Sequence, residues 1–376
     1  MSKPQRLLAA VLVLVMICFC EAGLAGTYVL PSSVTQLDSE AFSGNTKLTE
    51  ITLQSGVTSI GNKCFYGCSN LYKINIPSTV TSIGTSCFTG CLSDFLIRTT
   101  PGSYAMRWAR DNHVDFQANT HYRAFLIGQT YDDEPENQLN GTMNDVGSMK
   151  QFLSNASGTA YTISVGHDLT ASGILSGIDS NFGNAQDQDV SLFYYAGHGA
   201  GDGSLCGVQS TYVSPSKLRQ KLDGIRGRKI IILDSCHSGG IINSESGTMT
   251  RSLSAQSNQS AADFASSFIS AFTSTSDKAD DFNRYYILVA AAEDESSWET
   301  TIGNQVAGMF TSYLAKGLGY NPWTQSYTDL FADTNNSGAV SLREAYEYIK
   351  TNLTEAPQTV QVFPSDCTWI SIIRAR

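Results

Sequence analysis

The sequence predicts an α/β protein with a mostly parallel central sheet flanked by helices, preceded by a short repeat solenoid. Two observations carry this prediction. From residue 121 onward, strand-like and helical segments alternate, and several strand-like runs are apolar throughout. Such runs are typical of parallel strands that are buried on both faces. Before them, residues 34–91 repeat with a period of 23 residues, which is typical of a solenoid.

The composition narrows the class of protein. The 376 residues are enough for two domains, and an apolar fraction of 41% with a charged fraction of 15% predicts folded domains. Acidic residues outnumber basic ones, 34 against 24, and the net charge is −10. Without a basic patch a chain cannot neutralise a phosphate backbone, so we expect no nucleic-acid partner.

The first 26 residues have the pattern of a secretory signal peptide. Lys3 and Arg6 supply a basic start, an apolar run covers 7–19, and small residues follow within 22–26. The alternative is a permanent membrane anchor, but the apolar run is short for a membrane span. We therefore expect a secreted or cell-surface protein with no stable membrane span.

The repeated units begin at Val34, Val57 and Val80, and the second reads VTSIGNKCFYGCSNLYKINIPST. Their phenylalanine, glycine and cysteine pattern resembles leucine-rich repeats of the bacterial surface-antigen type. The segment PGSYAMRWARDNHVDF that follows resembles the C-terminal cap of such arrays. The resemblance implies a repeat domain over 27–117 that docks the protein on a surface or on a protein partner.

The nine cysteines are unevenly placed. Cys18 and Cys20 lie in the signal segment, and two C-x3-C pairs in the repeats consist of Cys64, Cys68, Cys87 and Cys91. One interpretation of that spacing is a zinc site. Because the pairs recur at the repeat period, we expect small buried core residues instead, and a disulfide remains open. The odd mature count of seven predicts at least one free thiol among these four and Cys206, Cys236 and Cys367.

The second domain is expected over 121–376. Strand-like runs are YRAFLIGQTY, YTISVG, SLFYYAG, KIIIL and YYILVAAA; helical runs are NDVGSMKQFLSNA, ASGILSGIDSNFG, SPSKLRQKL and GMFTSYLAKGL. Residues 241–283 interrupt this alternation. They are rich in Ser, Asn and Asp, with one short amphipathic patch at Phe264, Phe268 and Phe272, which predicts a mobile insert or linker.

Two of these strands end in residues that suit nucleophilic catalysis. SLFYYAGHG ends with His198 on a glycine-flanked turn, and KIIILDSCHSG ends with Cys236. Parallel strands share one edge for their carboxyl ends, so neighbouring strands would bring the imidazole and the thiol together. A histidine can draw a thiol toward thiolate and then protonate the leaving amine. His237 is the weaker base candidate, because its side chain points away from Cys236 on an extended backbone.

The glycines beside these residues let backbone N–H groups approach a developing oxyanion. Gly199 and Cys236 are the expected donors. Together, YYAGHG and DSCHSGG, with 38 residues from His198 to Cys236, resemble the motifs of caspase-like cysteine peptidases, closest to the metacaspase branch. The resemblance covers 121–376 and implies a caspase-like fold with a His198–Cys236 dyad.

The same resemblance implies cleavage after lysine or arginine. In metacaspase-like enzymes two acidic residues hold the basic P1 side chain, and Asp145 and Asp234 match their positions. Structural alternatives are a charge at a helix N-terminus for Asp145 and a turn acceptor for Asp234. This chain departs from the family at Ala196, where serine is frequent, and the acids that bind calcium in metacaspases have no match here.

A separate calcium candidate is the segment DTNNSGAVSLRE, residues 333–344, which fits the EF-hand loop pattern. Gly338 takes the turn position and Val340 the apolar position. The expected ligands are Asp333, Asn335, Ser337, Ala339 through its carbonyl, Ser341 and Glu344. The alternative is a capped loop without a metal. The low ligand charge predicts weak binding.

The leading hypothesis is a secreted cysteine endopeptidase acting on protein or peptide substrates. An enzyme that accepts basic P1 residues would cut itself in the polar insert, at Arg251 or Lys278. The rival hypothesis is an adhesin-like repeat protein whose inactive peptidase-like domain serves as a binding module.

Overall fold

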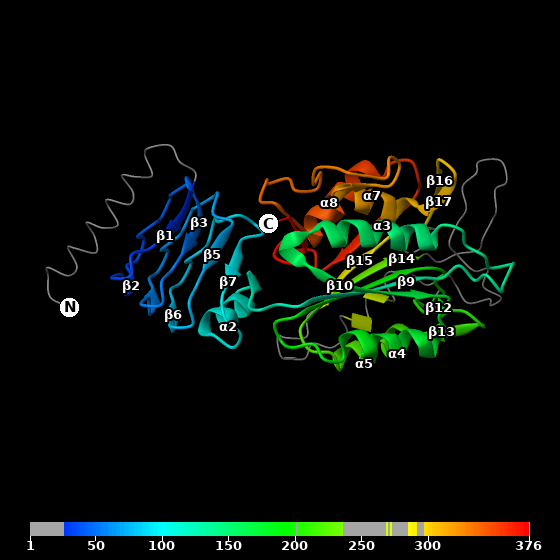
Figure 1. Cartoon of the computed structure of the whole chain (residues 1–376), viewed down its shortest axis with the longest axis horizontal. Helices are drawn as coiled ribbons and strands as arrows, with labels where there is room; N and C mark the ends of the chain where they lie inside the picture. Colours follow the sequence, from blue (N-terminus) through cyan, green and yellow to red (C-terminus); the bar gives the residue numbers. More distant parts are fainter. Residues whose placement is uncertain are drawn as a thin grey trace. The chain divides into compact units, whose positions relative to one another are not determined.

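The computed structural model describes residues 26–200, 202–235, 268–269, 271–272, 285–291 and 297–375. The chain divides into two compact units, the first ending at Asn119 and the second beginning at Thr120 (Figure 1). Residues 1–25 of the predicted signal segment and most of 241–283 lie outside the described residues, whereas Gly26 begins β1. Within the described ranges, no helix combines the length and the apolar character that a membrane crossing requires.

The first unit is a solenoid. It has a five-stranded sheet in the order β1-β3-β5-β7-β8 and a three-stranded sheet in the order β2-β4-β6, both parallel. The strands are β1 Gly26–Val29, β2 Gln36–Leu37, β3 Leu48–Thr52, β4 Ser59–Ile60, β5 Lys73–Asn75, β6 Ser82–Ile83, β7 Leu96–Arg98 and β8 Asp115–Gln117. Helix α2 (Tyr104–Asp111) begins after Ser103, whose side chain accepts the Met106 N–H.

Residues one period apart in the sequence become neighbours in this unit. Ile51 and Ile74 are register partners in adjacent strands, and both are fully buried. Phe42, Phe65 and Phe88 form a stack with ring centroids 5.1 and 5.5 Å apart. A single repeat cannot bury its own apolar face, so continuous columns of this kind form the core of the solenoid. The prediction of a repeat solenoid is confirmed.

The repeat cysteines belong to this core. Cys64, Cys68 and Cys87 are fully buried, Cys91 is partly exposed, and all four are free thiols. Burial raises the pKa of Cys68 to about 11 and that of Cys87 to about 12. The Cys68 thiol donates to the Phe42 carbonyl at 3.0 Å. Among the residues described here these cysteines form no metal-ligand cluster, which favours the core interpretation over the zinc site.

The second unit is a three-layer α/β structure. Its central sheet has the order β10-β9-β11-β14-β15-β21, parallel throughout except for β21, which runs antiparallel to β15. The strands are β9 Tyr122–Gly128, β10 Tyr161–His167, β11 Val190–Ala196, β14 Arg228–Asp234, β15 Tyr285–Val289 and β21 Gln361–Phe363. The helices are α3 Thr142–Asn155, α4 Ala171–Phe182, α5 Pro215–Asp223, α7 Met309–Gly317 and α8 Leu342–Asn352.

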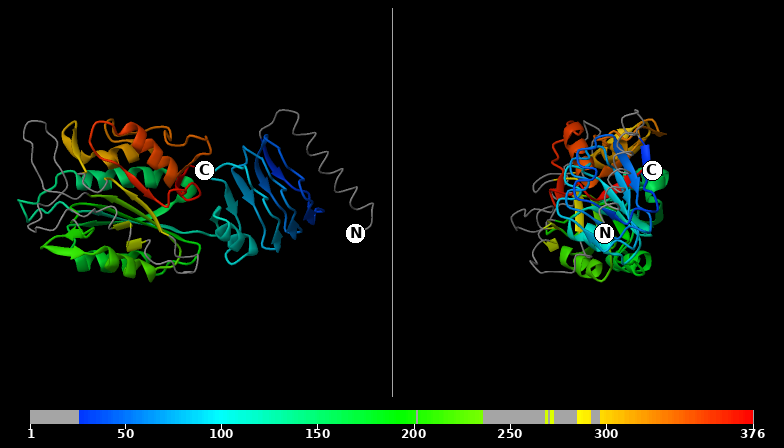
Figure 2. Two further views of the ribbon diagram at one scale, coloured as in Figure 1. Left: turned by 180° about the vertical axis from the view of Figure 1, so that it is seen from behind. Right: turned by 90° about the vertical axis from the view of Figure 1, so that its left-hand side faces the viewer.

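Alternation along the strands divides the core of this unit in two. Even-numbered strand residues such as Leu126 and Tyr194 pack with α3, α7 and α8, whereas odd-numbered residues such as Phe125 and Phe193 pack with α4 and α5. Figure 2 shows the same two helical layers from behind. The predicted parallel sheet, covered on both faces and therefore apolar in sequence, is confirmed.

Short elements complete the unit, and the sequence did not predict them as pairs. They are β12 Leu205–Gly207 with β13 Thr211–Val213, β16 Glu299–Ile302 with β17 Gln305–Gly308, β18 Tyr320–Asn321 with β19 Ser326–Tyr327, and β20 Ala339–Ser341 with β22 Ser371–Arg374. All four pairs are antiparallel. Strands of two to four residues carry too little periodicity to stand out from loops.

Part of the predicted mobile insert is packed. Phe268 and Phe272 stack with ring centroids 4.9 Å apart, and both lie in the core on the α4 and α5 side of the sheet. The rings of Phe272 and Tyr285 form a T-shaped pair with centroids 4.8 Å apart. Phe268 and Phe272 are therefore part of the core, and the rest of 241–283 lies outside the described residues, apart from 269 and 271.

Candidate active site

The register between β11 and β14 aligns the two candidate motifs. Ala196 and Asp234 are the last register partners of the two strands, and the Gly197 N–H donates to the Asp234 carbonyl at 3.3 Å. His198 and Cys236 each follow one of these partners by two residues. Cys236 itself lies outside the described residues. The backbone leading to each motif therefore ends at one edge of the sheet.

A backbone carbonyl orients the imidazole of His198. The side chain is buried, and its Nε2 lies 2.7 Å from the carbonyl oxygen of Asn137. Because a carbonyl only accepts hydrogen bonds, Nε2 must carry the proton. In the neutral ring the lone pair then lies on Nδ1, which is the nitrogen able to take a proton from a thiol. Sequence reasoning missed Asn137 because it acts through its backbone.

Two tyrosines fix the backbone around His198. The His198 N–H donates to the Tyr131 hydroxyl at 3.0 Å, and the Tyr195 hydroxyl donates to the His198 carbonyl at 2.8 Å. The two hydroxyls lie 3.2 Å apart, and each is 2.8 Å from the Cys206 carbonyl. Burial raises the pKa of both tyrosines well above the usual range, so both remain neutral.

The loop that carries Tyr131 is anchored by Asp168. This carboxylate accepts the N–H groups of Thr130 and Tyr131 at 2.6 and 3.0 Å, and Tyr131 has a positive φ of 57°. Burial alone would raise the pKa of Asp168, but the hydrogen bonds it accepts from this loop hold the pKa below its usual value. The anchor holds a residue in the left-handed region that would otherwise be strained. Nothing in the sequence pattern marks Tyr131 or Asp168 as part of the site.

Asp168 also belongs to a group of possible metal ligands. In the described part of the chain, Asp132, His167 and Asp168 form the one cluster of His, Cys, Asp or Glu ligand atoms, all within 4.8 Å of one another. However, both Asp168 oxygens already accept two hydrogen bonds each from the Thr130–Asp132 loop. The His167 Nε2 is likewise 2.8 Å from the Thr130 hydroxyl. The possible metal-ligand atoms of Asp168 and His167 are therefore already used in hydrogen bonds that hold the loop.

The expected oxyanion donor Gly199 lies directly after His198. It forms an isolated antiparallel bridge with Leu205. The two hydrogen bonds of that bridge use the backbones of His198 and Ala200, which pair with Cys206 and Ser204. The Gly199 N–H consequently points away from the bridge. The second expected donor, the backbone N–H of Cys236, lies outside the described residues.

The two acidic residues expected to hold a basic P1 side chain are fully buried against one short segment. The Asp145 carboxylate accepts the Gly308 N–H at 2.8 Å, and the Asp234 carboxylate accepts the Thr311 N–H at 3.3 Å and its hydroxyl at 2.6 Å. Ser297 donates to the other Asp234 oxygen at 2.6 Å. Gly308 is the N-cap of α7, whose dipole favours nearby negative charge. Both acids therefore help to hold the start of α7.

In the predicted calcium loop the expected ligands contact one another in two groups, Asp333 and Asn335 with Ser337, and Ser341 with Glu344. Asp333 accepts the N–H groups of Ser337 and Gly338, and Gly338 has a positive φ of 79°. Glu344 forms a capping box with Ser341 at the start of α8. The six candidate ligands offer only oxygen atoms, the donor type that calcium prefers. The residues present therefore fit a calcium ion, although the hydrogen bonds also stabilise the loop without one.

The two candidate self-cleavage sites, Arg251 and Lys278, lie outside the described residues. Before the Cys236 motif and its insert, the described residues end at Ser235, and after them they resume at Tyr285. Between these two points only 268–269 and 271–272 are described. Ser235 is fully buried at the end of β14.

Comparison with known proteins gives two family matches. The model of the caspase domain matches residues 121–363, and that of the BspA type leucine rich repeat region matches 16–99 with six copies. Among solved structures, a protein from Geobacter sulfurreducens is 15% identical, with a TM-score of 0.44 over 66% of this chain and 97% of that chain. Caspase-1 from Spodoptera frugiperda is 14% identical, with a TM-score of 0.40 over 65% of this chain and 87% of that chain. No curated protein matches.

Proposed function

Because the chain belongs to the caspase family and carries its peptidase domain, we propose that His198 and Cys236 form the catalytic dyad of a secreted endopeptidase. The observation that supports this most directly is the register of β11 and β14. Ala196 and Asp234 are partners, and the histidine and the cysteine each follow by two residues. A general base must lie within hydrogen-bond distance of its nucleophile. Two residues that follow paired strand residues by the same number of positions are favourably placed for this.

In this mechanism the His198 Nδ1 takes the proton of the Cys236 thiol. The thiolate attacks the scissile carbonyl carbon, and the N–H groups of Gly199 and Cys236 stabilise the resulting oxyanion. The C–N bond breaks as His198 donates its proton to the leaving amine, which leaves a thioester. Water, deprotonated by His198, then hydrolyses the thioester and releases the new carboxyl end. The Asn137 carbonyl keeps the ring oriented throughout.

We propose further that the enzyme belongs to the metacaspase-like branch and cleaves after arginine or lysine. Asp145 and Asp234 come from separate elements but both contact the start of α7. A basic P1 side chain loses hydration as it enters the site, and two carboxylates beside the start of α7 would offset that loss. The same pair would repel an acidic P1 residue. Arginine is favoured over lysine, because its planar fork can bind a carboxylate through two hydrogen bonds.

Localisation and maturation extend the proposal. The N-terminal 26 residues would direct secretion, and the BspA-type repeats would dock the enzyme on a surface or a protein partner. The chain would be a zymogen that cuts itself after Arg251 or Lys278. Calcium would bind at residues 333–344 and stabilise the α8 side of the peptidase unit, with Asp333 and Glu344 supplying the negative charge.

The function is tested with fluorogenic peptides that differ only at P1, which is Arg, Lys, Asp or Ala. We expect cleavage after Arg and Lys, none after Asp, and none with Cys236→Ala. A thiol-reactive substrate-like probe should label the parent chain and leave Cys236→Ala unlabelled. If the parent chain is neither labelled nor active under any condition, the adhesin-like binding module becomes the better description. Efficient cleavage after Asp would leave the peptidase intact and remove the basic P1 assignment.

A further inference from the structure

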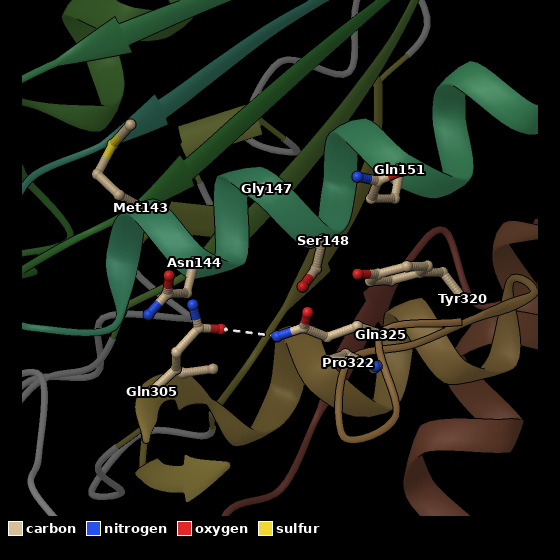
Figure 3. Close-up of a pocket in the computed structure, with 10 residues that line it drawn as sticks. Met143, Asn144, Gly147, Ser148, Gln151, Gln305, Tyr320, Pro322 and Gln325 are labelled. Atoms are coloured by element: carbon tan, nitrogen blue, oxygen red, sulfur yellow. Dashed lines mark hydrogen bonds between the residues drawn. The ribbon is translucent and has the colours of Figure 1, made fainter. Parts of the chain in front are cut away.

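A shallow groove of about 230 Å³ lies on the second unit, between α3 and the segments that carry β17 and β18. Its polar lining contains four side-chain amides and two hydroxyls, those of Asn144, Gln151, Gln305, Gln325, Ser148 and Tyr320. No described residue that lines the groove is charged. Figure 3 shows that these side chains approach the groove from both sides, and Gln325 donates to Gln305 at 3.4 Å on the side opposite α3.

The floor of the groove contains Gly147, in the interior of α3. A Cβ atom added there would meet nothing within 4 Å. Gly177 in α4 differs, because a Cβ there would lie 2.5 Å from the ring of Phe125. Packing therefore explains Gly177 but not Gly147, although a glycine inside a helix lowers helix stability relative to alanine. An open space above the helix backbone at this point suits the close approach of a ligand.

A peptide strand is not the ligand that this groove suits. Peptides commonly bind by adding a strand to an exposed sheet edge. The edge of β17 that faces α3 is already covered, since Asn144 donates to the Val306 carbonyl at 2.7 Å and Asp145 accepts the Gly308 N–H at 2.8 Å. The recognition groups that remain are side-chain amides, hydroxyls and aromatic rings. They suit a ligand that is itself rich in hydroxyl groups.

We propose that this groove binds a neutral carbohydrate, with one sugar ring above Gly147. Sugar hydroxyls both donate and accept hydrogen bonds, as amide and hydroxyl side chains do. The aromatic rings supply apolar faces for the C–H side of a sugar. Tyr320 lines the groove. Tyr327 is 52% exposed, and its ring centroid lies 5.7 Å from that of Tyr320. The Tyr327 hydroxyl donates to the Gln151 side chain at 2.8 Å.

Binding should not depend on pH near neutrality. Among the described residues, the groove lining holds no carboxylate, amine or imidazole. Burial raises the pKa of Tyr320, the one titratable group among these described lining residues, so its phenol remains neutral. Binding should also be independent of the candidate base, because His198 is not among the described residues that line the groove.

The test is isothermal titration of the full chain with maltotetraose, cellotetraose, mannotetraose and chitotetraose. We expect at least one to bind with a dissociation constant of about 1 mM or lower. Gly147→Leu should abolish binding, because its side chain would fill the space above the helix. Lys150→Leu is the matched control, since this exposed residue of α3 does not line the groove. It should bind as the parent does.

Gly147→Ala provides a second variant that should fold without difficulty. The added methyl meets open space, so the melting temperature should rise while the affinity falls. The proposal is overturned if none of the four tetrasaccharides binds, or if Gly147→Leu binds as tightly as Lys150→Leu. It is also overturned if a tetrapeptide of Ser and Gly binds in their place and Gly147→Leu blocks it, because the groove would then be a peptide subsite.

Discussion

Tyr131 holds His198 in two ways. Its ring lies against the imidazole with centroids 4.8 Å apart, and its hydroxyl accepts the His198 backbone N–H at 3.0 Å. The Tyr131 hydroxyl also lies 2.8 Å from the Cys206 carbonyl, so one side chain links the β9 loop to the histidine turn. The orientation of the candidate base thus depends on a residue that is 67 positions away in the sequence.

Tyr131→Phe is expected to impair the orientation of His198 without removing any candidate catalytic group. The variant keeps the ring contact but leaves the buried His198 N–H without its acceptor, which should cost about 1–3 kcal/mol of stability. We expect kcat to fall about tenfold while KM changes little. Steady-state kinetics on an arginine peptide measures both. Tyr212→Phe, at a tyrosine that is 49% exposed, is the control. An unchanged kcat in Tyr131→Phe would contradict the positioning role.

Asp145→Asn separates a P1-binding role from a structural one. The amide oxygen can still accept the Gly308 N–H, so the start of α7 should remain in place. The negative charge is lost, and kcat/KM for arginine peptides should fall by about tenfold to hundredfold. The melting temperature measures the structural role in the same sample. An arginine preference that survives in both Asp145→Asn and Asp234→Asn would show that the two acids are only structural acceptors.

Lys229 should make stability depend on pH. It is 1% exposed in β14, and burial lowers its pKa to about 7, although Asp223 and Asp187 act in the opposite direction. Between this pKa and the unfolded value near 10.4, the unfolded chain binds the extra proton. The free energy of unfolding of the protein should therefore rise with pH, by up to about 1.4 kcal/mol per pH unit, and fall as pH drops toward 7.

Lys229→Met serves as the reference for this effect, because the two chains share every other titratable group. Urea unfolding at pH 7, 8 and 9 gives the free energy of unfolding of each. The difference between the parent and Lys229→Met should grow in favour of the parent across this range. Parallel curves for the two chains would mean that Lys229 remains protonated in the folded state.

Glu344→Gln should remove stabilisation by calcium and little else. A glutamine at this position can still cap α8 from the third helical position, so stability without calcium should change little. If the loop binds the ion, the parent should gain about 2.7 kcal/mol at a calcium concentration of 100 Kd, and the variant should gain less. Melting curves with and without calcium provide the measurement. Identical parent curves under the two conditions would exclude the site.

Self-processing should depend on both the nucleophile and a basic residue in the insert. Arg251 lies in TMTRSLS and is the preferred site over Lys278 in SDKADD. We expect mass spectrometry to find fragments ending at Arg251 in the parent and none in Cys236→Ala. Arg251→Ala should shift cleavage to Lys278 or abolish it. A parent chain that stays intact at full activity would show that maturation by cleavage is not needed.

The sequence by itself determined the two folds and their order. The 23-residue period predicted columns of equivalent residues, and Phe42, Phe65 and Phe88 form one. The apolar runs predicted a parallel sheet, because strands covered on both faces need apolar residues at every position. His198 and Cys236 were recognisable because each follows such a strand with polar and glycine residues. Each of these patterns lies within a short stretch of the chain, so one sequence is enough to detect it.

Tertiary structure alone decided the surroundings of the candidate base. Asn137 acts through a backbone carbonyl, and a backbone atom leaves no mark in the residue type. Tyr131 and Asp168 reach His198 through contacts between separate strand ends, so no spacing along the chain connects them. The sequence shows Phe268 and Phe272 as part of a short amphipathic patch, but only the structure shows that they pack on the α4 and α5 side of the sheet. Local periodicity reports which face of an element is buried, whereas the identity of its neighbours depends on how the chain packs.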